Sequence, residues 1–480
     1  MDALGCAGSE FCRQYCEALR SQRVAVVYDK AGCNVPAMFT IKTTGIDFDP
    51  KPVEDAIRNT ELVNYIGGTL CGVLIERTGK SPELQAVVKL KAAYGQAFKA
   101  RLELWQCMLE ATYEGRSFTD AELEYYQAKV DDSGNAVRLR AANALPEIVL
   151  RAQAAADRAT VDEHGLLFDD QIISVTDRLV GNLIDGTPML LVGDKGIAKT
   201  QAAKFVAKLW DSDTEPVIIS GHGDMMSNEF IGQMEQDKDT GMFAFKEGGL
   251  VQAMREGRPV ILDEVNVGDQ AVFMRLQDLL LRRPGQSVRL QETDGGSFEI
   301  PPGFVVLATA NEASVRYKHR NVLDPAFRDR YDVLLLQYPD SDSDKSPLVE
   351  VPSSLMRLAL AAAVDEKGVI SKHINTADLE CLVRLAYVTQ HLYSVPSHNS
   401  RVSITEGNST SAFLDDEPAM TDCITPRALA ETVKRCAPGN KPGLTLASEM
   451  ERLIKGLDRA GSTHNQGYAR RALTLLKASL

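Results

Sequence analysis

The sequence predicts a doubly wound α/β fold with a parallel five-stranded sheet, preceded by a mainly helical N-terminal region and followed by a helical C-terminal part. Three observations indicate this fold: short apolar runs, helical stretches between them, and a glycine-rich turn directly after the first run. Parallel strands that are covered on both faces read as continuous apolar runs, and their alternation with helices is typical of such sheets. The runs are residues 188–192, 216–220, 258–262, 304–310 and 332–337.

The residues ahead of the predicted sheet divide into two parts. Residues 1–80 mix short apolar runs with turn signals, which indicates a small α+β region. Residues 81–165 carry apolar side chains three or four positions apart, which indicates a helical bundle or hairpin. The expected helices run from Ser81-Pro82-Glu83 to near Glu114, onward from a capping box of Thr119 and Glu122, and over 136–158, where Pro146 breaks or restarts the helix.

Residues 166–340 form the predicted α/β domain, and two stretches interrupt its alternation of strands and helices. Residues 233–246 and 287–300 each contain a turn rich in Asp and Gly, so both predict inserted β-hairpins. After an acidic linker, residues 346–480 predict a helical lid and C-terminal helices, with a polar loop at 397–420. The helices are expected at 355–363, 376–393, 426–436, 444–457 and 467–480.

Composition narrows the class of protein. With 480 residues, 44% hydrophobic and 25% charged, the chain is long enough for two or three domains. No apolar run approaches the roughly 20 residues that span a bilayer, and no basic region with an apolar stretch opens the chain, so we expect no membrane insertion and a cytoplasmic location. Nine cysteines without a Cys-x-x-Cys pair argue against a zinc site and a disulfide framework. The net charge of −13 argues against a general nucleic-acid coat.

A phosphate-binding loop is predicted between the first apolar run and the helix that follows it. Backbone N–H groups of such a turn, together with the helix N-terminus, make a site for anionic phosphates. We expect Lys199 to neutralise charge on the β and γ phosphates of ATP, and the Thr200 hydroxyl to bind Mg²⁺. Ala198 stands where glycine is usual, which a methyl group tolerates if the local φ is negative. The loop reads Gly193-Asp194-Lys195-Gly196-Ile197-Ala198-Lys199-Thr200.

Two further apolar runs end in polar residues suited to metal binding and water activation. Asp263 and Glu264 follow the third run, where ligand sites of open α/β sheets lie. Asp263 fits a direct or outer-sphere hold on Mg²⁺, and Glu264 fits the general base that polarises the attacking water. The alternative is a solvated Asp-Glu pair at a strand end. Asn311 ends the fourth run, level with Glu264, and can hydrogen-bond the water or the γ-phosphate without adding charge.

An arginine just before the last run can serve a neighbouring subunit. Arg330 is expected to complete the site of the next protomer as an arginine finger, and Arg328 is the competing candidate. The alternative for Arg330 is a surface ion pair with Asp329 or Asp332. A site shared in this way requires an oligomer.

These motifs resemble those of the AAA+ ATPases, in particular the MoxR-like and dynein-related (AAA_5) branch, and the Gly-Ile-Ala-Lys part of the loop is similar to RavA-type members. The resemblance covers about residues 167–457. Its most specific parts are residues 193–200, 243–250, 263–266, 300–304 and 308–311.

The resemblance implies an ATP-hydrolysing ring, commonly a hexamer, with nucleotide bound between subunits and a lid that moves on hydrolysis. In the lid, Ile424-Thr425-Pro426-Arg427 is similar to the sensor-2 segment of the family, which implies that Arg427 contacts the γ-phosphate. It also implies that the two hairpins face partners or the pore. The sequence departs from the family pattern in two places. A proline is common where Asp194-Lys195 stands, and residues 1–165 match no part of the pattern.

Three functional hypotheses follow. In the leading one, the ring remodels a protein client, which the resemblance suggests could contain a von Willebrand A domain. The second, less favoured, is a nucleic-acid motor in which basic residues in or beside the hairpins line a pore. The third is a nucleotide-gated scaffold, against which the intact water-activating residues argue. The basic residues are Lys238, Lys246, Arg282, Arg283 and Arg289.

Overall fold

The computed structural model divides into two compact units, which we describe separately. The sheet unit comprises Phe98–Asp131 and His164–Gln337, and the helical unit comprises Met1–Ala97, Asp132–Glu163 and Tyr338–Leu480. Helices α4 (Pro82–Tyr113) and α5 (Asp120–Ala142) contribute residues to both. The structure describes residues 25–28, 39–42, 82–236, 243–267, 270–290, 297–311, 323–338, 353–394, 403–406, 409–412, 420–439, 443–457 and 464–479.

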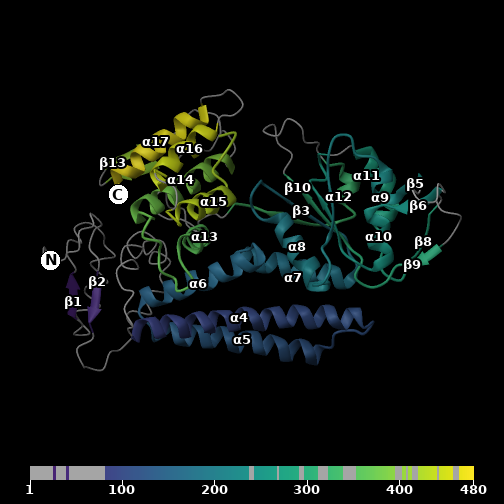
Figure 1. The fold of residues 1–480 in the computed structure, drawn as a ribbon, viewed down its shortest axis with the longest axis horizontal. Helices are drawn as coiled ribbons and strands as arrows, with labels where there is room; N and C mark the ends of the chain where they lie inside the picture. The colour runs from purple at the N-terminus through teal and green to yellow at the C-terminus, as the bar shows by residue number, and fades with distance from the viewer. Residues whose placement is uncertain are drawn as a thin grey trace. The chain divides into compact units, whose positions relative to one another are not determined.

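A parallel five-stranded sheet forms the centre of the sheet unit (Figure 1). The strand order is β11-β3-β10-β7-β4, and every neighbouring pair is parallel. This confirms the predicted fold class, and each strand coincides with one of the five apolar runs. The strands are β3 (Met189–Gly193), β4 (Val217–Ser220), β7 (Val260–Asp263), β10 (Val306–Ala310) and β11 (Asp332–Leu336).

Helices cover both faces of this sheet, which explains why the strands are apolar throughout. On one face, Leu190, Leu262 and Ala308 share a buried core with Met254 of α10 and Phe273 of α11. On the other face lie α7 and α8. The helix α7 was not among the elements predicted from the sequence. The helices of this unit are α7 (Asp170–Asp185), α8 (Lys199–Trp210), α9 (Ser227–Ile231), α10 (Gly249–Glu256), α11 (Gln270–Leu280) and α12 (Pro325–Arg328).

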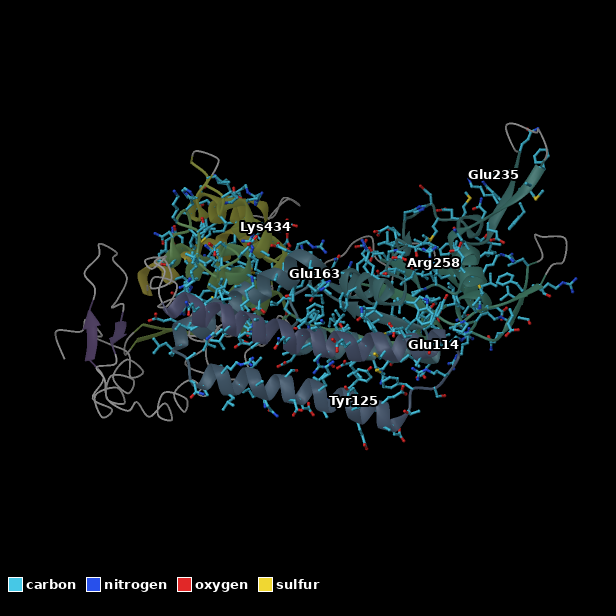
Figure 2. All side chains as sticks on the ribbon, turned by 60° about the horizontal axis from the view of Figure 1, so that its bottom comes forward. Glu114, Tyr125, Glu163, Glu235, Arg258 and Lys434 are labelled. Atoms are coloured by element: carbon cyan, nitrogen blue, oxygen red, sulfur yellow. The ribbon has the colours of Figure 1, made fainter. Side chains whose placement is uncertain are left out.

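Both predicted hairpins are present. β5 (Gly232–Gln236) pairs with β6 (Phe243–Glu247), and β8 (Ser287–Arg289) pairs with β9 (Ser297–Glu299). The turns that the sequence predicted at their tips lie outside the described residues. Figure 2 labels Glu235 on the first hairpin, which extends away from the helices of its unit. Side chains alternate between the two faces along each strand, and in this register Met234, Phe243 and Phe245 share one face. The hairpin therefore has one apolar face.

The five C-terminal helices that the sequence predicted are all present in the helical unit. Its buried side chains include Leu360, Leu382 and Leu429. Asp157 of α6 (Pro146–His164) accepts two hydrogen bonds from Arg357, at 2.9 and 2.8 Å, which stabilises the packing of this helix against α13. The helices are α13 (Ser353–Ala363), α14 (Thr376–Ser394), α15 (Pro426–Cys436), α16 (Leu446–Gly456) and α17 (His464–Ser479).

One sequence prediction about secondary structure was confirmed and another was wrong. The helical stretch expected over 136–158 is the end of α5 and the start of α6, and it restarts at Pro146 as expected, because Pro146 lacks an N–H and fits the first position of a new helix. Within the expected loop at 397–420, β12 (Ser403–Glu406) pairs with β13 (Ser409–Ala412), since Ile and Thr residues suit strands.

The capping box before α5 is confirmed. The Glu122 N–H donates to the Thr119 hydroxyl, and the Thr119 N–H donates to the Glu122 carboxylate. Of residues 1–80, the structure describes only an antiparallel pair, β1 (Ala25–Tyr28) and β2 (Phe39–Lys42). No helix among the described residues is both long and apolar enough to cross a membrane.

The turn that leads into β10 depends on a glycine. Gly303 has φ +97°, and a Cβ placed on it would lie 2.1 Å from the indole ring of Trp210. The Trp210 Nε1 donates to the Gly257 carbonyl at 3.0 Å, so the ring has a fixed position. The close approach of this ring to the backbone therefore excludes a side chain at residue 303.

We predict that Gly303→Ala lowers the free energy of unfolding by about 2–5 kcal/mol, because a strained backbone angle and an overpacked contact add together. Gly285→Ala is the matched control: Gly285 has φ +80° but no atom within 4 Å of its Cβ position. This control should cost only about 1–2 kcal/mol. Chemical denaturation of both variants measures the difference, and equal losses would contradict the steric explanation.

Candidate active site

The candidate site is built where three neighbouring strands end. In the sheet, Leu262 of β7 pairs with Ala308 of β10, and Thr309 pairs with Leu191 of β3. Side chains in register on parallel strands point to the same face, so Asp263 and Thr309 are neighbours on the face that α8 covers. The predicted phosphate loop follows β3 directly and ends where α8 begins, at Lys199.

Lys199 is held inside this loop. Its side chain is 7% exposed. The Nζ donates to the carbonyls of Gly193 and Asp194, at 2.8 and 2.6 Å, and to the Oδ1 of Asn311 at 2.9 Å. An ammonium group has three protons to donate, and these three acceptors match that number. The positive charge is therefore fixed between the loop and the end of β10.

The start of the loop also packs closely against the edge strand of the sheet. A Cβ on Gly193 would lie 2.2 Å from the carbonyl oxygen of Leu336, the last residue of β11. Residue 193 must therefore be glycine for β3 and β11 to pair along their full length. The loop position is tied in this way to the edge of the sheet.

The condition that the sequence analysis placed on Ala198 is not met. Ala198 has φ +65°, in the left-handed region, rather than a negative φ. For a residue with a Cβ this conformation costs about 1–2 kcal/mol, because the Cβ crowds the following carbonyl. The surrounding loop and helix impose this angle, so the Ala-for-Gly replacement stores strain at the entry to α8.

One oxygen of the Asp263 carboxylate accepts hydrogen bonds from two hydroxyl groups. Thr200 Oγ1 and Thr309 Oγ1 each lie 2.6 Å from Asp263 Oδ1. A carboxylate can only accept, so the Thr200 proton points at Asp263 and the hydroxyl lone pairs remain available. Mg²⁺ prefers oxygen ligands of this kind. The donor set of Thr200 and Asp263 therefore fits Mg²⁺ beside a phosphate.

Glu264 is held in an unusual backbone conformation next to the predicted water site. Its φ of +57° is left-handed. The Glu264 N–H donates to Thr309 Oγ1 at 3.0 Å, and its side-chain Oε1 accepts from Asn311 Nδ2 at 3.2 Å. A Cβ on Gly221 would lie 2.3 Å from the Glu264 carbonyl oxygen, so that glycine leaves room for the turn. Strained residues of this kind cluster at functional sites.

Three residues of the site were missed by the sequence analysis, namely Gly221, Asn266 and Thr309. Asn266 is 1% exposed and donates through Nδ2 to the backbone carbonyl of Asn311 at 2.8 Å. Asn266 and Thr309 lie within the motifs that carried the family resemblance, so the signal was present in the sequence. No sequence signal marked Gly221.

The two arginine-finger candidates lie away from this cluster. Asp332 pairs with Met189 at the start of β3, whereas Gly193 ends that strand. Asp332 is separated from the loop by the length of β11, about 13 Å at 3.3 Å per residue. Arg330 precedes Asp332, so it lies beyond the opposite end of the strands. Arg330 therefore does not reach the site of its own subunit.

Arg330 and Arg328 are both exposed, and within the described residues neither forms an ion pair. Asp332, which the sequence analysis considered as a partner of Arg330, is bound by Arg178 Nε at 2.5 Å, and this contact holds the pKa of the Asp332 carboxyl below its usual range. Arg330 instead lines an open pocket of about 500 Å³ beside α11. Arg427 lies on α15 in the helical unit, so its contact with phosphate stays a prediction.

We predict that Ala198→Gly raises the free energy of unfolding by about 0.5–1 kcal/mol, because the released strain exceeds the entropic cost of glycine in the unfolded chain. Ala207→Gly, inside α8 with a negative φ, is the control and should lower stability by about 1 kcal/mol. Denaturant titration of both variants checks the opposite signs. A loss of stability in Ala198→Gly would contradict the assignment of strain.

Comparisons with known proteins agree with this geometry. The family model described as AAA domain (dynein-related subfamily) matches residues 188–331. Midasin of Giardia intestinalis is 29% identical over 171 residues, which are 35% of this chain and 3% of the relative. The mouse von Willebrand factor A domain-containing protein 8 is 32% identical over 158 residues, covering 28% of this chain and 8% of the relative. The matches thus span a small part of these relatives.

A solved structure from Cytophaga hutchinsonii, described as a candidate ATPase, is 20% identical and covers 49% of this chain and 71% of that chain, with a TM-score of 0.28. That superposition is too weak to add to the assignment. The family match, the strand order and the clustered polar residues suffice, and they show that the chain carries an AAA domain of the dynein-related branch of the AAA+ ATPases.

Proposed function

We propose that this protein is a MoxR-like ATPase that hydrolyses ATP in an oligomeric ring and uses the energy to remodel or activate a protein partner. The observation that carries the proposal is the hydrogen-bonded chain Lys199–Asn311–Glu264 beside Thr200 and Asp263. It links a phosphate-binding cation, a metal-binding oxygen pair and a general base in one site. A nucleotide-gated scaffold would need only the first two of these.

The loop residues bind the nucleotide. The N–H groups between Gly193 and Thr200 and the start of α8 favour phosphate oxygens. Lys199 turns from the loop carbonyls to the β and γ phosphates, since a phosphate is a stronger acceptor than a carbonyl. Thr200 and Asp263 would hold Mg²⁺, which when bound would neutralise charge that develops on the phosphates.

Glu264 acts as the general base. Its carboxylate lies at the end of β7, and the hydrogen bond that it accepts from Asn311 fixes its position for taking the proton of the attacking water. Asn311 contacts both Lys199 and Glu264. When Lys199 moves to phosphate, Asn311 loses one partner and can orient the water toward the γ-phosphate. Asn311 thus couples the arrival of nucleotide to the position of the base.

The position of Arg330 supports the ring. Arg330 lies at the end of the strands opposite the loop. It is exposed and lines an open pocket, which suits insertion into the site of a neighbouring subunit. A hexamer is the stoichiometry that the family resemblance suggests. Arg427 on α15 is the residue that the sensor-2 resemblance suggests for contact with the γ-phosphate. Arg328 remains the alternative finger.

A protein is the partner that we favour. The mouse relative is named for a von Willebrand factor A domain, and this name supports a client or partner of that class. The nucleic-acid alternative needs free basic residues at the hairpins. Lys246 instead pairs with Glu235 at 3.1 Å, and Arg282 pairs with Asp278 at 2.7 Å. These pairs reduce the positive field that phosphate backbones require.

We predict that Glu264→Gln lowers kcat for ATP hydrolysis by about 100-fold or more, because an amide cannot accept the water proton. ATP binding should persist, since Lys199 and Thr200 are unchanged. Steady-state phosphate release and equilibrium ATP binding measure the two effects. Glu215→Gln, at an exposed Lys208 ion pair, is the control and should match the wild type. Unchanged turnover in Glu264→Gln would reject the catalytic assignment.

We predict that Arg330→Ala lowers turnover by about 1,000-fold, whereas Arg328→Ala lowers it far less. Mixing tests whether Arg330 acts across subunits. Lys199→Ala chains cannot hold phosphate but carry an intact Arg330, so adding them to Arg330→Ala chains should restore turnover above that of either variant alone. Absence of complementation in assemblies shown to be mixed would exclude a finger supplied by a neighbour.

A further inference from the structure

The hydroxyl of Thr309 connects the two acidic residues of the site. Its side chain is buried, with 1% of its surface exposed, at the second-last position of β10. Thr309 Oγ1 lies 2.6 Å from Asp263 Oδ1 and 3.0 Å from the backbone nitrogen of Glu264. One hydroxyl thus contacts both the residue proposed to hold Mg²⁺ and the residue proposed as base.

The direction of both hydrogen bonds is fixed by chemistry. The Glu264 N–H can only donate, so Thr309 Oγ1 accepts from it. The single proton of this hydroxyl then goes to Asp263, which as a carboxylate can only accept. The O···O distance of 2.6 Å is in the range of a charge-assisted bond. The Thr309 hydroxyl therefore accepts a hydrogen bond from the Glu264 N–H and donates one to the Asp263 carboxylate.

Thr309 also holds the strained turn at Glu264. The Val265 N–H donates to the Thr309 carbonyl at 2.9 Å, so residue 309 binds two consecutive amides on either side of the left-handed Glu264 conformation. A left-handed non-glycine residue persists only where its surroundings fix it. Thr309 supplies two of those contacts, one from its side chain and one from its backbone.

We infer that Thr309 is a positioning residue whose hydroxyl sets the Asp263 carboxylate for Mg²⁺ and the Glu264 backbone for water activation. This inference rests on the proposed ATPase function. Asp263 Oδ1 accepts hydrogen bonds from Thr200 and Thr309, and in the described part of the chain no hydrogen bond reaches Oδ2. The second oxygen is thereby left to bind the metal or one of its water ligands.

The role of the hydroxyl is separable from that of the methyl group. Thr309→Val keeps the shape and β-branching but removes both hydrogen bonds of the side chain. Thr309→Ser keeps the hydroxyl and loses the methyl group. Thr176→Val is a matched control, because Thr176 is also fully buried in the sheet unit but donates only to the Ile172 carbonyl of its own helix.

The experiment measures three quantities for each full-length variant: the Kd for ATP in EDTA, the Kd for ATP in Mg²⁺, and the Mg²⁺ dependence of kcat. We expect Thr309→Val to lower kcat, or to raise the Mg²⁺ concentration for half-maximal rate, by about 10–100-fold, as for other partners of metal ligands. Its Kd for ATP in EDTA should stay within about threefold of wild type. Thr309→Ser should recover most of the loss, and Thr176→Val should match wild type.

Two outcomes would overturn the inference. One is a Thr309→Val protein with wild-type Mg²⁺ dependence and kcat, and the other is a Thr309→Ser protein as impaired as Thr309→Val. If Thr309→Val loses its cooperative unfolding transition, Thr309→Cys, with similar volume and a weak donor, gives the same test. Wild-type protein that binds ATP·Mg²⁺ without hydrolysing it would reject the ATPase proposal alone, because the ratio of the two Kd values still tests Thr309.

Discussion

The parallel register between β7 and β10 is the constraint on which the site depends. Because Leu262 pairs with Ala308, Asp263 and Thr309 follow side by side on one face. A slip of one residue would turn Thr309 to the opposite face, since side chains alternate along a strand. It would also move the Asn311 side chain, whose Oδ1 accepts from Lys199 and whose Nδ2 donates to Glu264. Buried apolar residues on both faces fix this register, so the core determines the chemistry.

The architecture could be predicted from the sequence because its strands are buried on both faces. Their apolar runs gave the five parallel strands, and the Asp- and Gly-rich turns gave both hairpins. The proline signal at residue 146 also gave the start of α6. The signal that failed was weaker, because the polar composition of 397–420 hid the strands β12 and β13. Domain boundaries at 80, 165 and 340 remain predictions.

The site could be predicted only in part. Five polar residues of the site could be predicted because each stands at the end of a strand or the start of a helix, where its side chain suits one role in the chemistry. The structure places them in contact with one another: Lys199, Thr200, Asp263, Glu264 and Asn311. The negative φ on which the tolerance of Ala198 depended is absent, because the path of the loop sets that angle and the residue type does not. Thr309 and Asn266 were missed since their contacts cross from β10 to the turn after β7. Such contacts follow from register, which composition does not encode.

The contact between Gly193 and Leu336 has a consequence for the proposed ring. β11 runs from the neighbourhood of Arg330 at one end to the phosphate loop at the other, with Leu336 closely packed against Gly193. A short hydrogen-bonded strand transmits a displacement along its length with little bending. A shift of Arg330 imposed by nucleotide in one subunit would therefore be felt at the loop of the subunit that carries this arginine. In the proposed ring, the states of neighbouring sites would then be coupled through β11.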